Sequence, residues 1–268
     1  MGQPLVLIVA YRNTTALEAA LSTLGGGRGV LIVDNGVDPD VLALAARHGA
    51  DYLTPGRNIG FAAAVNLGLT RRAGRNVLLL NPDARIEPGG VGALSATLDA
   101  DRSLCAVAPR LRGDDGVAQR VEWPIPSPTV EWLKALRLER LAPAGRSFLA
   151  GAVLVLRDEA IDDVGLFDER FFLYAEECDW QLRALRKGWK VRVVDEVTAI
   201  HSGAGSSDVE TVRAGHFQES ARLFGIKWYG RAGWASMRTA SLCAAAVRLP
   251  FSVFDGDRRA RYARQLRP

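Results

Sequence analysis

Short, nearly continuous runs of Val, Ile and Leu alternate with helix-like stretches through the first hundred residues. The strand-like runs are Leu5–Tyr11, Val30–Asp34, Tyr52–Leu53 and Val77–Leu80. The helix-like stretches are about Thr14–Leu24, Pro39–His48, Ile59–Arg72 and Gly89–Asp99. Strands that are apolar throughout are buried on both faces. The pattern therefore predicts a doubly wound α/β fold, with a parallel sheet covered by helices.

The second half of the chain is less regular. Turn residues and three prolines between Arg112 and Gly145 predict a variable connection. A strand pattern follows at Ser147–Arg157, with Gly151 inside it, and glycine within a strand indicates a bulge or a close approach by a ligand. The remaining expected elements are a helix at about Glu176–Lys187 and strand-like runs at Lys190–Val194 and Val197–Ile200.

Composition narrows the class of protein. The 268 residues are 48% apolar, enough for one large domain or two small ones. Because the net charge is only +4, we expect no nucleic-acid partner. Three widely spaced cysteines indicate reduced thiols in the cytoplasm. The start of the chain has no basic leader, so we expect no secretory signal, and the apolar stretch Ala232–Val247 is shorter than the roughly 20 residues of a membrane span.

Positive charge gathers near the C-terminus. From Arg231 onward there are eight arginines against two acids, Asp255 and Asp257, mixed with apolar residues. This composition is typical of a surface helix that meets anionic lipid. It is equally typical of a basic helix that packs on its own domain or on a second subunit, as in a homodimer.

Polar residues stand where the predicted strands end, which is where sheets of this kind bind ligands. They are Tyr11, Asp34 and the turn Asn81-Pro82-Asp83. Asp34 could accept a hydrogen bond from a ribose or a base, or could shape an Asn-Gly turn. Asp83 could bind a hard cation such as Mg²⁺ or could belong to a Pro-Asp turn. The pattern alone leaves both alternatives open.

Arg57 and Asn58 come directly before a predicted helix that is rich in small residues and contains Asn66. A helix N-terminus beside an arginine would place an anionic diphosphate well. A simple capped helix accounts for Asn58 and the alanines but leaves Arg57 unexplained. The glycine run at 25–29 closes a helix instead of opening one, so it does not predict a phosphate loop.

Three carboxylates, Glu176, Glu177 and Asp179, follow the aromatic run Phe171–Tyr174. The helix dipole favours acids in a first turn by roughly 0.3–1 kcal/mol each, which accounts for one or two of them. A carboxylate held in a partly apolar cleft can act as a general base. His201 ends a strand-like run before a flexible loop; a lone histidine is commonly structural, although imidazole also suits Mn²⁺.

Taken together, these segments resemble the inverting glycosyltransferases of family 2 with the GT-A fold, especially the bacterial rhamnosyltransferase-like branch. The resemblance covers about residues 4–207. The matching segments are Val9–Tyr11, Val33–Gly36, Arg57–Phe61 with Asn66, Asn81–Asp83, Phe148–Ala152, Gly165–Glu169, Glu176–Trp180 with Arg183, Gly188–Trp189 and His201–Gly203.

The resemblance implies a Rossmann-like doubly wound mixed sheet with helices on both faces. It implies a GT-A domain at 1–207, with a nucleotide-binding part at about 1–110 and an acceptor-binding part at about 146–207. Residues 208–268 would form a basic helical extension.

Site roles follow from the same resemblance. Tyr11 and Asp34 would lie near the base, and Arg57, Asn58 and Gly60 near ribose and diphosphate. Asp83 and His201 would hold Mg²⁺ or Mn²⁺. Glu177 takes the position of the catalytic base, with Glu176 as the alternative and Asp179 orienting the base or the acceptor. The remaining expected substrate contacts are Ala10, Asn66, Asn81, Gly151, Ala152 and Trp180.

The sequence departs from the family pattern at two positions. The first acid of the DXD-type motif is Asn81, which leaves one carboxylate for the metal. The base position carries Glu177 where Asp is more common.

The implied reaction is an inverting transfer, in bacterial cell-wall or polysaccharide biosynthesis, from a nucleotide sugar such as dTDP-L-rhamnose to a glycan, lipid-linked or small-molecule hydroxyl. The protein would work in the cytoplasm or on the inner face of the membrane. A noncatalytic sugar-nucleotide-binding or scaffold protein is the alternative. A nucleotidyltransferase would need a glycine-rich, lysine-bearing loop after the first strand, which this sequence lacks.

Overall fold

The computed structural model describes residues 2–26, 29–142, 145–203 and 210–248. The chain forms two compact units. The first comprises Met1–Trp123 and Phe148–Ser220, and the second comprises Pro124–Ser147 and Ala221–Pro268. The stretch between Arg112 and Gly145, expected to be a variable connection, thus supplies part of the second unit from Pro124 onward.

A mixed sheet forms the core of the first unit. Its strands are β1 (Leu5–Ala10), β2 (Val30–Asp34), β3 (Asp51–Leu53), β4 (Val77–Leu80), β5 (Ala84–Ile86), β6 (Leu104–Arg112), β7 (Ala118–Gln119), β10 (Val153–Leu156) and β11 (Lys190–His201). They lie in the order β3-β2-β1-β4-β10-β6-β11-β5, and β7 pairs with β6. β1 to β4 are mutually parallel, whereas β10 runs antiparallel to both β4 and β6. The predicted Rossmann-like mixed sheet is confirmed.

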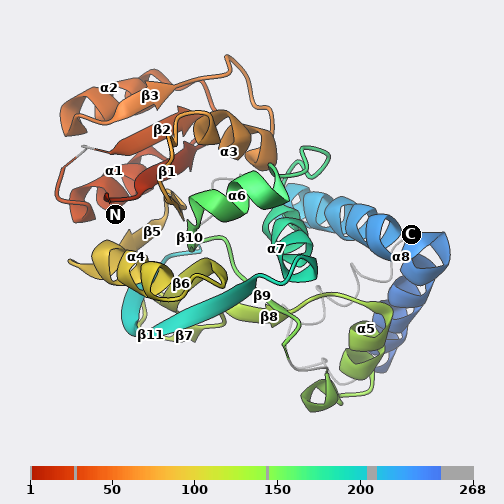
Figure 1. The fold of residues 1–268 in the computed structure, drawn as a ribbon. Coiled ribbons are helices and arrows are strands. Elements are labelled where there is room, and N and C mark those ends of the chain that lie inside the picture. The colour runs from red at the N-terminus through yellow and green to blue at the C-terminus, as the bar shows by residue number, and fades with distance from the viewer. Residues whose placement is uncertain (1, 27–28, 143–144, 204–209, 249–268) are drawn as a thin grey trace. The chain divides into compact units, whose positions relative to one another are not determined.

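Helices cover this sheet (Figure 1). They are α1 (Thr14–Thr23), α2 (Pro39–His48), α3 (Phe61–Leu69), α4 (Gly90–Ala100), α6 (Asp158–Val164) and α7 (Glu176–Arg186). α3 packs on β1 and β2, and α4 packs on β6 and β11. Every residue of β1, β2 and β4 is buried, as the continuous apolar runs predict.

Two strand expectations differ from the structure. The run 147–157 forms two strands, β9 (Ser147–Leu149) and β10, separated at residues 150–152. The separation arises because the Ala150 amide bonds to the Val121 carbonyl, whereas the Ala152 carbonyl accepts from the Asn81 amide. The two runs at 190–194 and 197–200 form one strand, β11, whose register against β6 shifts between Val194 and Thr198.

The second unit contains short elements of the expected connection and a long helix. The short elements are α5 (Pro128–Ala135) and η1 (Glu139–Leu141). β8 (Glu122–Pro124), which pairs with β9, begins in the first unit and ends at Pro124. α8 (Glu210–Arg248) enters this unit after Ser220 and changes direction at the non-helical Gly230. The Tyr229 hydroxyl donates to the Pro126 carbonyl over 2.9 Å.

Within the described residues, none of the helices combines the length and the apolar character that a membrane span requires. The C-terminal arginines beyond Arg248 lie outside the described residues. The expected membrane or subunit contact of that stretch therefore stays a prediction.

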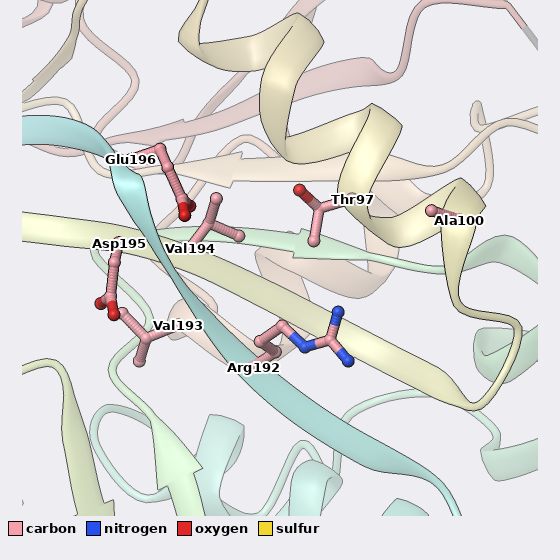
Figure 2. A pocket seen from close by; sticks show the side chains of 7 residues that line it. All are labelled: Thr97, Ala100, Arg192, Val193, Val194, Asp195 and Glu196. Atoms are coloured by element: carbon pink, nitrogen blue, oxygen red, sulfur yellow. The ribbon is translucent and has the colours of Figure 1, made fainter.

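A hollow of about 460 Å³ lies between α4 and β11 (Figure 2). Thr97 and Ala100 line it from α4, and residues 192–196 line it from β11. The Arg192 guanidinium pairs with Asp101 over 2.7 Å, and Asp195 pairs with Arg110 over 3.1 Å. None of the predicted site residues lines this hollow, so we place no chemistry there.

Candidate active site

Asp83 and His201 face each other although they lie far apart in the chain. β11 pairs antiparallel with β5, and this pairing sets His201 opposite Ala84, the residue after Asp83. Nε2 of His201 lies 3.5 Å from Oδ1 of Asp83, whose side chain is only 7% exposed. The Ser202 amide also donates to the Asp83 carbonyl over 3.1 Å. The fold therefore brings the two predicted metal ligands into contact.

Gln119 of β7 fixes the imidazole of His201. Its Nε2 donates to the His201 carbonyl over 2.8 Å, so its Oε1 is turned toward Nδ1 of the ring at 3.0 Å. An amide oxygen only accepts, which requires the proton on Nδ1, and in the neutral ring the lone pair of Nε2 then faces Asp83. An outer partner of this kind is typical of histidines that bind metals.

The donor set fits a divalent cation. A carboxylate oxygen and an imidazole lone pair face one another at 3.5 Å, close to the separation of two ligands that each lie about 2.1 Å from one ion. The side-chain amide of Asn81 makes no hydrogen bond with a described residue, so its oxygen is available as a weaker ligand. Across the described ranges, no group of three His, Cys, Asp or Glu forms a metal cage, so the remaining ligands would come from substrate or water.

A short backbone path joins this pair to the acidic helix. The Asn81 amide donates to the Ala152 carbonyl over 2.9 Å. Its neighbour Gly151 lies against Glu177: a Cβ added to Gly151 would lie 3.6–3.7 Å from three carbons of the Glu177 side chain. The break between β9 and β10 thus places Gly151 and Ala152 between the Asp83 turn and Glu177.

Glu176 and Glu177 begin α7 with little solvation. Glu176 is only 4% exposed, and the Oε2 atoms of both residues are buried without a hydrogen-bond partner among the described residues. Burial, followed by repulsion from Glu177, raises the pKa of Glu176 well above its usual range. Burial also raises the pKa of Glu177, although the amides of Glu177, Gly151 and Cys178 oppose the rise by bonding to the carboxylate. Burial therefore favours the neutral form of both carboxyl groups, and repulsion from Glu177 adds to this effect at Glu176.

Asp179 and Trp180 are fixed in the interior. Asp179 is fully buried and pairs with Arg183 over 3.0 Å, one helical turn further on. Trp180 is also fully buried, donates its Nε1–H to the Gly165 carbonyl over 2.8 Å and stacks on Phe167. Both residues hold α7 against residues 164–167, and their predicted contacts with acceptor or substrate stay predictions.

Replacing Glu176 with Gln should change how stability depends on pH. A carboxyl group with a raised folded-state pKa stabilises the fold below its unfolded value of about 4.5, and this stabilisation is lost as pH rises through the folded-state pKa. Glu176→Gln removes that loss, which is about 1.4 kcal/mol for every tenfold difference in proton affinity between the folded and unfolded states. The free energy of unfolding of the variant, relative to wild type, should therefore increase between pH 4.5 and pH 8 in denaturant titrations.

Glu159→Gln is the matched control, since the Glu159 side chain is 53% exposed. Parallel pH profiles for wild type and Glu176→Gln would contradict the raised pKa.

The loop before α3 is held by Asn35. The Asn35 side chain accepts from the Ile59 amide over 2.9 Å and donates to Oδ1 of Asn58 over 2.9 Å. Oδ1 of Asn58 in turn accepts from the Gly60 amide over 3.0 Å. The Phe61 amide donates to the Phe172 carbonyl over 2.7 Å, which ties this loop to the segment that leads into α7. Arg57 is left exposed at the rim of the loop.

Gly60→Ala should destabilise the fold by about 2–4 kcal/mol. Gly60 has φ +86°, and an added Cβ would lie 2.8 Å from both the ring and the carbonyl oxygen of Phe172. Gly92→Ala in α4 is the matched control, because nothing lies within 4 Å of its added Cβ; it should stabilise the helix by about 0.5–1 kcal/mol. Thermal and denaturant unfolding measure the stability of both variants. Equal stability of Gly60→Ala and Gly92→Ala would contradict the close packing of Phe172 on Gly60.

The ends of β1 and β2 are occupied by internal bonds. Asp34 is fully buried and accepts from the amides of Gly36 and Asp38 and from the Tyr52 hydroxyl. The Ala10 carbonyl accepts from the Asn35 amide over 2.9 Å. Asp34 thus shapes the turn, as its alternative interpretation holds, and a direct contact with a nucleotide stays a prediction. Tyr11 remains beside this turn, with the Arg12 guanidinium 5.0 Å from its ring centre.

Comparison with known proteins decides the family. The profile of glycosyl transferase family group 2 matches residues 77–254. The chain belongs to this family. The matched stretch contains Asp83, Glu177 and His201, and the predicted glycosyltransferase activity is confirmed at the level of the family.

Relatives of this glycosyltransferase include a rhamnosyltransferase. An N-acetylglucosaminyl-diphospho-decaprenol L-rhamnosyltransferase of Mycobacterium tuberculosis is 30% identical over 235 residues, 75% of this chain and 76% of the relative. A low-salt glycan biosynthesis hexosyltransferase, Agl10 of Haloferax volcanii, is 25% identical over 207 residues, 74% of this chain and 66% of the relative.

Solved structures of low identity show the same fold. The mannosyltransferase PcManGT from Pyrobaculum calidifontis, in complex with GDP-Man and Mn²⁺, has a TM-score of 0.61 at 14% identity and covers 99% of this chain and 85% of its own. GalNAc-T7 with UDP, GalNAc and Mn²⁺ has a TM-score of 0.59 at 14% identity, covering 96% and 54%. The predicted GT-A fold is confirmed.

Sequence reasoning missed three residues that position the site of this transferase. Gln119 stands in a segment expected to be a variable connection, and nothing near it indicates a partner for His201. Asn35 reads in the sequence as part of an Asn-Gly turn, although it binds the Arg57 loop. Phe172 belongs to the aromatic run before α7, whose apolar character gives no signal that its carbonyl caps α3.

Proposed function

We propose that this glycosyltransferase transfers L-rhamnose from dTDP-L-rhamnose to a hydroxyl group of a sugar acceptor by a single inverting displacement, with Glu177 as the base. The observation that carries the proposal is the buried, unpartnered Oε2 of Glu177 among the described residues, joined through Gly151, Ala152 and Asn81 to the Asp83–His201 pair. The rhamnosyltransferase relative at 30% identity supports the choice of sugar.

Glu177 is suited to proton removal. Its raised pKa makes the carboxylate a stronger base than an exposed glutamate, and the amides of Glu177, Gly151 and Cys178 oppose the rise by stabilising the charged form. Oε2 has no partner among the described residues and would accept the proton of the acceptor hydroxyl as that oxygen attacks the anomeric carbon. Burial and repulsion from Glu177 favour the neutral form of Glu176, which limits the negative charge beside the base.

Asp83 and His201, with the Asn81 amide oxygen, would hold Mg²⁺ or Mn²⁺. A bound divalent cation neutralises the charge of a departing nucleoside diphosphate. Gln119 keeps the imidazole in the tautomer that binds a cation. The Mn²⁺ in the two similar structures supports this choice of ion.

The acceptor is proposed from the same relative, whose name describes a sugar carried on diphospho-decaprenol. A lipid-linked acceptor is consistent with the basic C-terminal stretch of this chain and with work on the cytoplasmic face of a membrane.

A donor panel tests the proposal. The full chain is incubated with dTDP-rhamnose, UDP-GlcNAc, GDP-mannose and UDP-galactose, each with a diphosphate-linked GlcNAc acceptor and Mn²⁺, and product is detected by mass spectrometry. Transfer from dTDP-rhamnose is the expected result. Transfer from a different donor would overturn the sugar assignment. Binding of donors without transfer to any acceptor would favour the noncatalytic alternative.

A further inference from the structure

Charge is divided unevenly between the two units of the chain. The second unit, Pro124–Ser147 and Ala221–Pro268, carries 14 Lys and Arg against four Asp and Glu, whereas the first carries 20 against 26. The net charges are therefore +10 and −6, although the whole chain has only +4. Nine of the cations and two of the acids of the second unit lie within its described residues. The second unit thus attracts an anionic surface, which the first unit repels.

Two leucines of the second unit are exposed in the segment that joins α5 to η1. The exposed fractions of Leu136 and Leu141 are 62% and 63%. Single exposed leucines are common on protein surfaces, but these two lie within six residues and flank the exposed Arg137 and Arg140. Neither guanidinium has a side-chain partner among the described residues, and Glu139 is the one acid of the segment. We call the two leucines and the two arginines the α5–η1 surface.

The α5–η1 surface is supported by the packing of α5 on α8 (Figure 1). Nε1 of Trp132 donates to the Ser236 hydroxyl over 3.1 Å, and Nη2 of Arg248 donates to the Lys134 carbonyl over 2.6 Å. These contacts fix α5 to α8 within the second unit. The leucines at its C-terminal end stay exposed, so this packing does not cover them.

Arg137 occupies a backbone position that favours glycine. At the end of α5 the Leu138 amide donates to the Leu133 carbonyl over 2.7 Å, and the Arg137 amide donates to the Lys134 carbonyl over 3.2 Å. This pair of bonds closes a helix with one left-handed residue, which is commonly glycine. Here that residue is Arg137, with φ +60°. Because the turn itself favours glycine, the arginine indicates a role for its exposed charge.

We propose that the α5–η1 surface docks the second unit on an anionic lipid bilayer. Leu136 and Leu141 enter the headgroup region, and the two arginines bind lipid phosphates. Leucines beside arginines are typical of segments that lie in the membrane interface, and the positive field of the unit draws it to anionic headgroups. The arginines beyond Arg248 add to that field, but insertion of the leucines requires the α5–η1 surface. The docking goes beyond the proposed sugar transfer, because it involves neither donor nor acceptor.

Co-sedimentation of the full chain with vesicles tests the docking. Wild type should bind vesicles of phosphatidylglycerol and phosphatidylcholine in equal parts, and should bind pure phosphatidylcholine vesicles far less. Leu136→Ser combined with Leu141→Ser should weaken binding to the mixed vesicles roughly 10–100-fold, because less apolar area enters the interface. Leu42→Ser is the matched control, since Leu42 is a 51% exposed leucine on α2 in the first unit, and it should bind as wild type does.

Arg137 offers a test that loss of the fold cannot imitate. Arg137→Gly should weaken binding to the mixed vesicles about fivefold, the contribution of one cation near an anionic surface. Thermal unfolding should show that this variant is at least as stable as wild type, since glycine suits a φ of +60°. Arg137→Lys keeps the charge and should bind within about twofold of wild type.

Failure of wild type to bind the mixed vesicles would overturn the docking. Wild-type affinity in both the double leucine variant and Arg137→Gly would also overturn it, because binding would then belong to other residues. Light scattering tests a second copy of the chain as the occupant. A change from dimer to monomer in the double leucine variant, with unchanged vesicle binding, would make the surface a subunit interface and would overturn the lipid assignment. None of these measurements uses a sugar nucleotide, so their outcome is independent of the proposed transfer.

Discussion

Glu177→Gln is expected to lower kcat by roughly 10²–10⁴-fold, the usual contribution of a general base. The substitution keeps the size of the side chain and removes only its ability to take a proton. Donor affinity should stay within about twofold, because the donor bond breaks on the far side of the anomeric carbon from the base. Single-turnover rates, with donor affinity from calorimetry, measure the two effects separately.

Glu176→Gln is the sharpest control because it changes the adjacent residue in the same way. Burial and repulsion from Glu177 favour the protonated form of Glu176, so its amide analogue should keep kcat within a few-fold and should leave the acidic limb of the pH–rate profile in place. A large loss in Glu176→Gln together with an active Glu177→Gln would exchange the two assignments. Full activity in both variants would show that neither Glu176 nor Glu177 is the catalytic base.

Asp83→Ala is expected to abolish stimulation by Mn²⁺ and to lower the metal-dependent rate by about a hundredfold, since a bound cation supplies several kcal/mol of charge stabilisation. Donor binding should weaken only when Mn²⁺ is present. The measurements are initial rates and calorimetric donor titrations across a Mn²⁺ series, with and without chelator.

Asp195→Ala is the matched control, because Asp195 is a 62% exposed carboxylate on the same strand, β11, and pairs with Arg110. An unchanged Mn²⁺ response in Asp83→Ala would exclude the Asp83–His201 pair as the metal site. Gln119→Ala should have a smaller effect than Asp83→Ala, because Asp83 and His201 remain and only the hydrogen bond that orients the His201 imidazole is lost. Mn²⁺ affinity should fall roughly 10–100-fold.

The sheet could be predicted from the sequence because its strands are buried on both faces and their apolar runs are unbroken. The Asp83 turn followed from the same pattern, since polar residues at strand ends are visible in the sequence itself. The contact of Asp83 with His201 required the family resemblance, because antiparallel pairing of β5 with β11 is not encoded in either segment alone.

The state of each polar side chain could not be predicted. Asp34 and Asn66 look alike in the sequence as polar residues near a predicted site. In the structure, however, Asp34 bonds to its own turn, and Asn66 donates a hydrogen bond to the carboxylate of Glu169. Whether a residue bonds to the chain or to a ligand depends on burial and on partners far away in the sequence. The raised pKa values of Glu176 and Glu177 have the same origin, because desolvation exists only in the folded molecule.

Tyr174 and Ala175 enter α7 with φ values of 71° and 67°, a left-handed conformation that costs side-chain-bearing residues about 1–2 kcal/mol each. The cost falls directly before the carboxylates that the chemistry needs. Packing of Phe172 on Gly60 and the bond from the Ser220 hydroxyl to the Leu173 carbonyl hold the segment in place. Substitutions that relax this left-handed bend would stabilise the fold but would reorient Glu176 and Glu177 at the start of α7. Stability and activity therefore place opposite demands on residues 174 and 175.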